Sequence, residues 1–255
     1  DLPEVIYARE YDAAISPNGN IPVHAFNLIS PTFFANSSTG NKYSLWVNVY
    51  GVSERYLNVY GEKDLRAQMN QFFHRTYTHP VDGTTLDMKM LCNWYWYDET
   101  AILETGKGTK DWNFYRYAET LLSAAEAIAQ SSGVNAEAAG YLAQVKARAN
   151  MEGKDVSTIA SELQRLGKQA FIEECWKERL REFPLEMKIW DDCVRTGKFP
   201  QISATNKGEV QFVDLIGAKN GSGATFKATD LYWPIPVNEI QRNPNLTQNE
   251  GYSAK

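Results

Sequence analysis

The apolar positions in the second half of the chain repeat with the period of an α-helix. From Asp111 to Gly133 they recur at spacings of three, four and seven residues, which is the pattern of one buried helix face. Asp111 can cap the start of this helix, and Gly133 can end it. The stripe consists of Phe114, Tyr117, Ala118, Leu121, Leu122, Ala125, Ile128 and Ala129.

A second helix is predicted directly after the first, with Asn135 as its cap. Its inward residues are Ala138, Leu142, Val145 and Ala149. Two helices joined by a short loop predict a helical hairpin of the tetratricopeptide type.

A third, longer helix is predicted from Thr158 to Phe183. Its apolar stripe consists of Ile172, Cys175, Trp176, Leu180 and Phe183. Pro184 ends this helix or opens the next one, which continues to Gly197. Residues 200–230 are rich in glycine and serine and are predicted to form a loop.

Residues 1–110 lack a long helical period. Residues 45–50 alternate between an apolar and a mixed aromatic face, which predicts a strand, and residues 62–73 fit a short helix. We therefore expect a mainly α fold with a tetratricopeptide-like hairpin, further helices, long irregular aromatic-rich loops and minor β structure. Residues 1–110 would be the loop-rich segment of the same domain, and residues 111–255 a helical region with an extended, docked tail.

The tail is predicted to be rigid and mostly extended. Pro234 and Pro236 fix their own φ angles and bias the residue before each of them toward extended geometry. Apolar residues alternate along this segment, so we expect it to dock rather than fray. The side chains expected to be buried against the helices near Trp190 are Trp233, Ile235 and Leu246.

Charge and composition exclude several classes of protein. The net charge is −5, and the 26 basic residues are scattered without a stripe, so the footprint of a nucleic-acid-binding protein is absent. No apolar run approaches the roughly 20 residues that a membrane-spanning helix needs. The three cysteines, Cys92, Cys175 and Cys193, are too sparse for a disulfide framework or a zinc site. We expect no disulfide, no metal and no cofactor.

Catalytic motifs are absent from the sequence. Hydrolysis of a glycosidic bond needs two carboxylates about 5–9.5 Å apart, and the sequence cannot pair its many acids in space. Glu173, Lys177 and Arg181 follow one another at helical spacing, which favours ion pairing on the surface. A second charged set is expected to tie the helices and the tail together: Glu178, Arg179, Asp192 and Arg195.

Aromatic clusters carry the more informative chemistry. A sugar ring presents C–H bonds to the electron-rich face of Trp or Tyr, while nearby amides and acids bind its hydroxyls. One cluster surrounds the predicted strand at 45–50, and another covers residues 94–97. The candidate stacking residues are Tyr43, Trp46, Tyr50, Trp94 and Trp96. Core packing remains the alternative role for each of them.

Three segments, in order along the chain, resemble the SusD/RagB family of surface glycan-binding lipoproteins. They are residues 111–127, 178–198 and 231–252. The motif positions within the first two are Arg116, Glu126, Glu178, Arg179, Asp192 and Arg195. The chain departs from the family pattern at Met187, Ile189, Cys193 and Glu250. Ile189 cannot make whatever ion pair the family's arginine makes at that position.

The resemblance implies a non-catalytic protein that captures an oligosaccharide for a TonB-dependent transporter of the SusC type. It also implies an outer-membrane surface location, with a lipid anchor on a segment outside this chain, and a missing N-terminal half of the same protein. Two alternatives stay open on the sequence alone, namely a secreted glycoside hydrolase and a helical-repeat adaptor that binds proteins. An assay for released reducing sugar separates the hydrolase from the binding protein.

Overall fold

Helices dominate the part of the chain that the computed structural model describes, which is residues 4–12, 14–17, 52–79, 83–95, 97–99 and 108–253. The fold is mainly α with minor β structure, as predicted. The chain divides into two units, residues 1–187 with 202–210 and residues 188–201 with 211–255, and each is described by itself. The predicted division at residue 110 concerns loop and helix content, and it stays a prediction.

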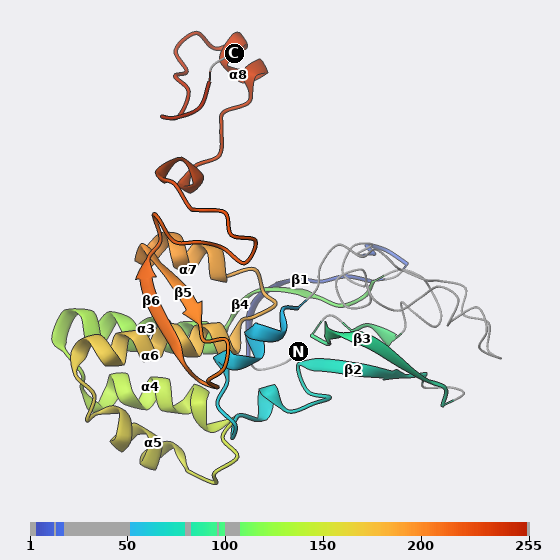
Figure 1. Ribbon diagram of the computed structural model, residues 1–255, viewed down its shortest axis with the longest axis vertical. Coiled ribbons are helices and arrows are strands. Elements are labelled where there is room, and N and C mark those ends of the chain that lie inside the picture. The colour runs from blue at the N-terminus through green and yellow to red at the C-terminus, as the bar shows by residue number, and fades with distance from the viewer. Residues whose placement is uncertain are drawn as a thin grey trace. The chain divides into compact units, whose positions relative to one another are not determined.

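Four helices form the body of the first unit (Figure 1). They are α3 (Tyr117–Ser132), α4 (Ala136–Ala147), α5 (Val156–Leu163) and α6 (Lys168–Glu182). Helix α3 packs against both α4 and α6, and α4 packs against α5. The predicted hairpin is therefore present as α3 and α4. Asn135 caps α4 by accepting a hydrogen bond from the backbone N–H of Ala138 at 2.9 Å.

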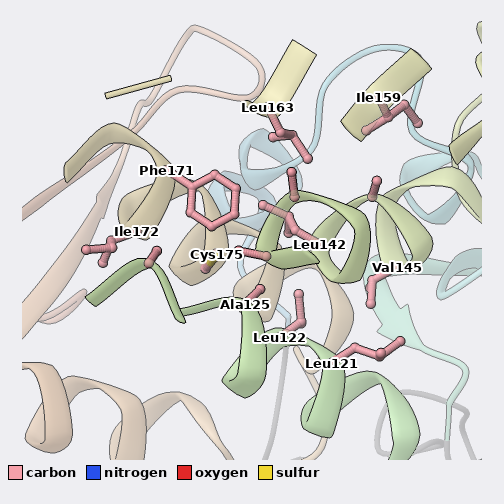
Figure 2. Packing of buried hydrophobic residues seen from close by; sticks show 14 of the residues in the cluster. Leu121, Leu122, Ala125, Leu142, Val145, Ile159, Leu163, Phe171, Ile172 and Cys175 are labelled. Atoms are coloured by element: carbon pink, nitrogen blue, oxygen red, sulfur yellow. The ribbon is translucent and has the colours of Figure 1, made fainter. Parts of the chain in front are cut away.

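The hydrophobic core of the first unit lies between these helices (Figure 2). Leu142 and Phe171 are fully buried there, and Leu122 and Cys175 belong to the same cluster. The inward residues predicted for the second helix, Ala138, Leu142, Val145 and Ala149, are all buried. Burying one large apolar side chain stabilises the folded state by about 1.5–3 kcal/mol, so burial of this cluster makes a large contribution to the packing of the helices.

The start of the first predicted helix is wrong. Residues Trp112–Arg116 form strand β4, and the helix begins only at Tyr117, so Asp111 does not cap it. Phe114, expected on the buried helix face, belongs to this strand and is 41% exposed. Aromatic residues favour strands, and strand β1 (Val5–Arg9) supplies the pairing partner that local periodicity cannot reveal.

The single long helix predicted from Thr158 to Phe183 is also wrong. It is divided into α5 and α6, with Gly167 as the residue that precedes α6. A glycine inside a helix costs about 1 kcal/mol relative to alanine, which favours a break at this position. Asp155 caps α5 by accepting a hydrogen bond from the backbone N–H of Thr158 at 2.8 Å.

Short two-stranded sheets complete the described β structure. Strand β1 pairs with β4, β2 (Phe73–Thr78) pairs with β3 (Thr85–Asn93), and β5 (Lys198–Ile202) pairs with β6 (Val210–Asp214). The short helix predicted over residues 62–73 is wrong. This segment contains a 3-10 turn at Leu65–Ala67 and the start of β2. Strands β5 and β6 occupy part of the loop predicted at 200–230, and the strand predicted at 45–50 lies outside the described residues.

Glu178 is the centre of a buried charge cluster on α6. Its side chain is 1% exposed and lies 2.9 Å from Nη1 of Arg66 and 3.1 Å from Nη1 of Arg181. Lys146 Nζ approaches it to 3.7 Å. Arg181 was expected in surface ion pairs, but it is only 7% exposed, and its Nε donates to the carbonyl of Val59 at 3.0 Å. Burial of the end of α6 against the 3-10 turn Glu54–Val59 explains the difference.

The remaining motif positions make local and inter-helix contacts. Arg116 reaches Glu4 at 2.6 Å, Glu182 at 3.1 Å and Glu186 at 2.6 Å, so it connects β4 with β1 and with the end of α6. Arg179 lies 3.2 Å from Glu119 and joins α6 to α3. The buried residue Glu126 lies on α3. Asp192 and Arg195 pair with each other at 3.2 Å within α7 (Ile189–Thr196).

The second unit contains α7, most of β5 and β6, and the tail. The tail is not wholly extended, because it forms a 3-10 turn (Ala228–Leu231) and helix α8 (Val237–Arg242). The expected burial of Trp233 is wrong, since its side chain is 88% exposed, and Leu246 is 37% exposed. Among the described residues, no helix combines the length and apolar character that crossing a membrane requires.

Candidate functional site

Three exposed aromatic side chains gather on the sheet formed by β1 and β4. We call Tyr7, Phe114 and Tyr115 the sheet platform. Their exposed fractions are 58%, 41% and 57%. The ring of Tyr7 stacks on Phe114 with centroids 5.4 Å apart and on Tyr115 with centroids 6.5 Å apart. Such flat, accessible rings have the geometry that stacks against the C–H face of a sugar.

An irregular strand register builds the sheet platform. Consecutive side chains of a regular strand point to opposite faces, so Phe114 and Tyr115 could not both contact one ring across a regular ladder. The antiparallel pairing of β1 with β4 shifts register on both sides of Tyr7, between Val5 and Tyr7 and between Tyr7 and Ala8. Bulges of this kind redirect side chains, and here they bring both rings to Tyr7.

A polar pocket of about 540 Å³ borders the sheet platform. Its lining consists of Val5, Ile6, Tyr7, Ala8, Glu10, Lys110, Asp111 and Asn113. The carboxylate of Asp111 accepts a hydrogen bond from the backbone N–H of Tyr11 at 2.9 Å, which holds it beside β1. An aromatic wall with carboxylate, amide and ammonium groups matches the mixture of C–H and hydroxyl groups on a saccharide.

Tyr95, which belongs to the predicted aromatic run at 94–97, lies next to this pocket. Asn113 donates a hydrogen bond to the Tyr95 hydroxyl at 3.4 Å, and Lys110 Nζ lies 5.5 Å from the centre of the Tyr95 ring. Burial raises the pKa of Tyr95 to about 12, so its hydroxyl stays protonated at neutral pH. Burial lowers the pKa of Lys110, and the nearby Asp98 opposes that shift. The backbone N–H of Thr109 donates to Asp98 at 2.6 Å, which fixes the loop that carries Lys110.

Trp94 is the one predicted stacking residue that lies within the described part of the chain. It is half-buried and stacks with His74 at a centroid distance of 3.9 Å and with Tyr97 at 4.7 Å. Contacts with these two rings occupy stacking surface of the Trp94 indole. A sugar contact of Trp94 stays a prediction. Tyr43, Trp46, Tyr50 and Trp96 lie outside the described residues, and their predicted role stays a prediction too.

Tyr56 and Tyr60, which follow the predicted strand at 45–50 in the sequence, have packing roles. Tyr60 is fully buried, and its hydroxyl donates to the carbonyl of Arg181 at 3.1 Å. The hydroxyl of Tyr56 donates to the carbonyl of Leu180 at 2.7 Å, and burial raises its pKa well above the usual value. Both side chains therefore hold the end of α6 rather than face a ligand.

The sheet platform was missed in the sequence because its parts are far apart. Tyr7 lies in a segment without a clear pattern, and the helical period predicts a helix at Phe114 and Tyr115. The available signal was strand propensity, since four of the five residues in Trp112–Arg116 are not strong helix formers. No group of three or more His, Cys, Asp or Glu side chains that could hold a metal ion occurs among the residues that the structure describes.

Comparison with known sequences decides the family. A sequence model of the SusD family matches residues 34–252. This chain belongs to the SusD family. A curated relative, the starch-binding protein SusD of Bacteroides thetaiotaomicron, is 36% identical over 138 residues, which are 54% of this chain and 21% of the relative.

Solved structures show the same fold. A SusD superfamily protein from Parabacteroides distasonis has a TM-score of 0.79 and 28% identity, and the match covers 98% of this chain and 50% of that protein. A surface glycan-binding protein A from Bacteroides thetaiotaomicron, solved in complex with laminarihexaose, has a TM-score of 0.61 and 19% identity, with 96% of this chain and 52% of that protein covered. This chain therefore spans about half the length of these two solved proteins.

Proposed function

We propose that this chain is part of a cell-surface protein that binds an oligosaccharide without cleaving it. The observation that carries the proposal is the sheet platform beside a polar pocket, in a chain that belongs to the SusD family. One relative is named for starch binding, and one structural neighbour was solved with laminarihexaose. A shallow, open aromatic surface is more typical of a protein that binds a long glycan chain than of an enzyme with a closed active site.

The charges of the described residues favour binding over hydrolysis. A glycosidase needs a carboxylic acid whose pKa is raised so that it can protonate the leaving group. Four carboxyls among the described residues instead have a pKa that is shifted downward: Asp155, Glu174, Glu178 and Asp214. Burial alone would raise the pKa of Glu178, but Arg66, Lys146 and Arg181 outweigh it. These carboxylates are held as anions by cations or by hydrogen-bond donors.

The proposal extends to location and partners. Family membership supports a lipid-anchored protein on the outer-membrane surface, which passes its glycan to a TonB-dependent transporter of the SusC type. The match to half of each solved relative supports a further half of the same protein that completes the helical fold.

Binding without turnover is tested with laminarihexaose and maltohexaose. We expect calorimetry to detect binding of at least one hexaose and a reducing-sugar assay to detect no release of new ends. Tyr115→Ala should weaken binding about 5- to 150-fold, because stacking on an aromatic ring is worth about 1–3 kcal/mol per contact. Tyr7→Phe keeps the ring and should bind as the wild type does.

Two results would contradict the proposal. Sustained release of reducing ends that co-purifies with the wild-type protein would indicate a hydrolase. Unchanged affinity in Tyr7→Ala and Tyr115→Ala, with unchanged melting temperatures, would remove the sheet platform from the binding surface.

A further inference from the structure

The tail forms a second aromatic pocket, which lies wholly within the second unit. This tail pocket has a volume of about 340 Å³. Its lining includes Trp190, Asn220, Phe226, Asp230, Tyr232 and Trp233. The exposed fractions of Trp190, Tyr232 and Trp233 are 38%, 62% and 88%. Three large aromatic side chains thus face solvent around one hollow.

Hydrogen bonds from Asn249 and Tyr252 hold the backbone of the tail pocket in place. Asn249 donates to the carbonyl of Trp233 at 2.7 Å, and the Tyr252 hydroxyl lies 2.9 Å from the carbonyls of both Thr229 and Tyr232. The turn before Tyr252 depends on Gly251, whose φ is +85°. Any larger residue would place its Cβ in a clash with the side chain of Thr229. The backbone on both sides of Tyr232 and Trp233 is therefore fixed while their rings remain exposed.

The floor of the tail pocket is aromatic as well. The ring of Phe226 contacts Trp190 at a centroid distance of 5.6 Å and Phe199 at 5.2 Å. These contacts set the position of Trp190 before any ligand arrives, which reduces the entropy that binding would cost.

Polar groups with free hydrogen-bonding capacity border the aromatic rings. The side-chain oxygen of Asn220 accepts from the backbone N–H groups of Ser222 at 3.1 Å and Ala224 at 2.9 Å, and within the described part of the chain its NH₂ group has no acceptor. One carboxylate oxygen of Asp230 accepts from the backbone N–H of Lys227 at 2.8 Å, and no described residue donates to the other. Trp190 and Trp233 in the lining also carry indole N–H groups, which can donate to a ligand.

We propose that the tail pocket is a second saccharide subsite, which takes one neutral hexopyranose unit of a bound glycan. This inference rests on the proposed function, and it adds a contact separate from the sheet platform. Aromatic faces for the ring C–H bonds, with an amide and a carboxylate for the hydroxyls, fit a pyranose. A neutral sugar is favoured because Asp230 is the one charged side chain in the lining as the structure describes it.

The test uses the full chain with Tyr115→Ala as background, so that the sheet platform contributes little. Laminarihexaose and maltohexaose are titrated into this variant and into the same variant with Trp233→Ala. We expect a residual affinity that Trp233→Ala lowers about 5- to 150-fold. Ile216→Ala is the matched control, since Ile216 is an exposed apolar residue of the same unit outside the lining, 47% exposed. It should leave both affinity and melting temperature unchanged.

Oxidation by N-bromosuccinimide, mapped by mass spectrometry, gives an independent measurement in the complete protein. We expect Trp233 to be oxidised in the free protein and protected by the hexaose. Protection of Trp233 without sugar would show that another protein segment covers the tail pocket, which overturns the subsite. Binding that Trp233→Ala leaves unchanged would overturn the subsite but keep the proposed function. Absence of any binding by the wild type would overturn both.

Discussion

Glu178 shows how far one buried residue can depend on its neighbours. Its carboxylate contacts Arg66 and Arg181 at 2.9 and 3.1 Å. Burial acts to raise its pKa, but the attraction of Arg66, Lys146 and Arg181 is stronger and holds the pKa well below its usual value of 4.5. In the unfolded chain these cations are distant, so Glu178 binds a proton more readily there than in the native protein.

The first prediction concerns the stability of this cluster. Glu178→Gln leaves two buried guanidinium groups short of a counter-charge, which typically costs about 3–5 kcal/mol. The contribution of Glu178 to the free energy of unfolding is complete above pH 4.5 and is lost as the pH falls below that value. The wild type should therefore lose stability more steeply than Glu178→Gln between about pH 5 and pH 3.

Urea denaturation at several pH values measures this difference. The matched control is Glu250→Gln, which changes an exposed glutamate of the tail. It should follow the wild-type curve. Parallel curves for the wild type and Glu178→Gln would show that the pKa of Glu178 is ordinary.

At the same scale, the site residues differ in how well a sequence can reveal them. The dense aromatic run at 94–97 is a local signal that points to Trp94, and the structure places its neighbour Tyr95 within hydrogen-bonding distance of the pocket residue Asn113. Tyr7 could not be selected, because its role depends on two rings that are more than a hundred residues away and on a shift in strand register. The exposure of Trp233 was missed because alternating apolar residues indicate an anchored segment without saying which ring is buried.

At the level of elements, the helical hairpin was the most predictable part. Its two stripes and the Asn135 cap are local features, and local features determine α4 in the structure. The element that failed was β4, since its strand conformation depends on pairing with β1. A helix can be recognised from its own residues, whereas a strand also needs its partner.

The second prediction tests the helical core. Leu142→Ala removes a fully buried α4 side chain from the core cluster formed by α3, α4, α5 and α6, and it should lower the free energy of unfolding by about 2–5 kcal/mol. Leu166→Ala removes the same atoms from a residue that is 36% exposed and should cost less than half as much. Equal losses in guanidinium titrations of the two variants would show that Leu142 is not tightly packed.

At the level of the whole molecule, three free thiols report on different parts of the chain. Cys92 lies in β3, Cys175 in α6 and Cys193 in α7, and all three are buried. Burial raises the pKa of Cys92 to about 12. Burial, with a further contribution from Asp192, raises the pKa of Cys193 to about 11. The reactive thiolate is therefore scarce at pH 8 in every part.

The third prediction is that the native protein does not react with Ellman's reagent at pH 8. Three equivalents should react after unfolding in guanidinium. Cys193 belongs to the second unit, so selective early labelling of this thiol at low denaturant would show that the second unit opens first. A disulfide in mass spectra of the non-reduced protein would contradict the predicted absence of bridges.

The pairing of β1 with β4 also has a consequence for the order of folding. The backbone N–H of Tyr11 and the carboxylate of Asp111 that it contacts are 100 residues apart. Closing so long a loop costs more entropy than forming a helical hairpin, so α3 and α4 can form well before the sheet closes. At about 5–20 residues per second, a ribosome needs roughly 5–20 seconds to make the partner of β1. Tyr7 is therefore synthesised seconds before Phe114 and Tyr115, and the sheet platform can form only after both strands have been made.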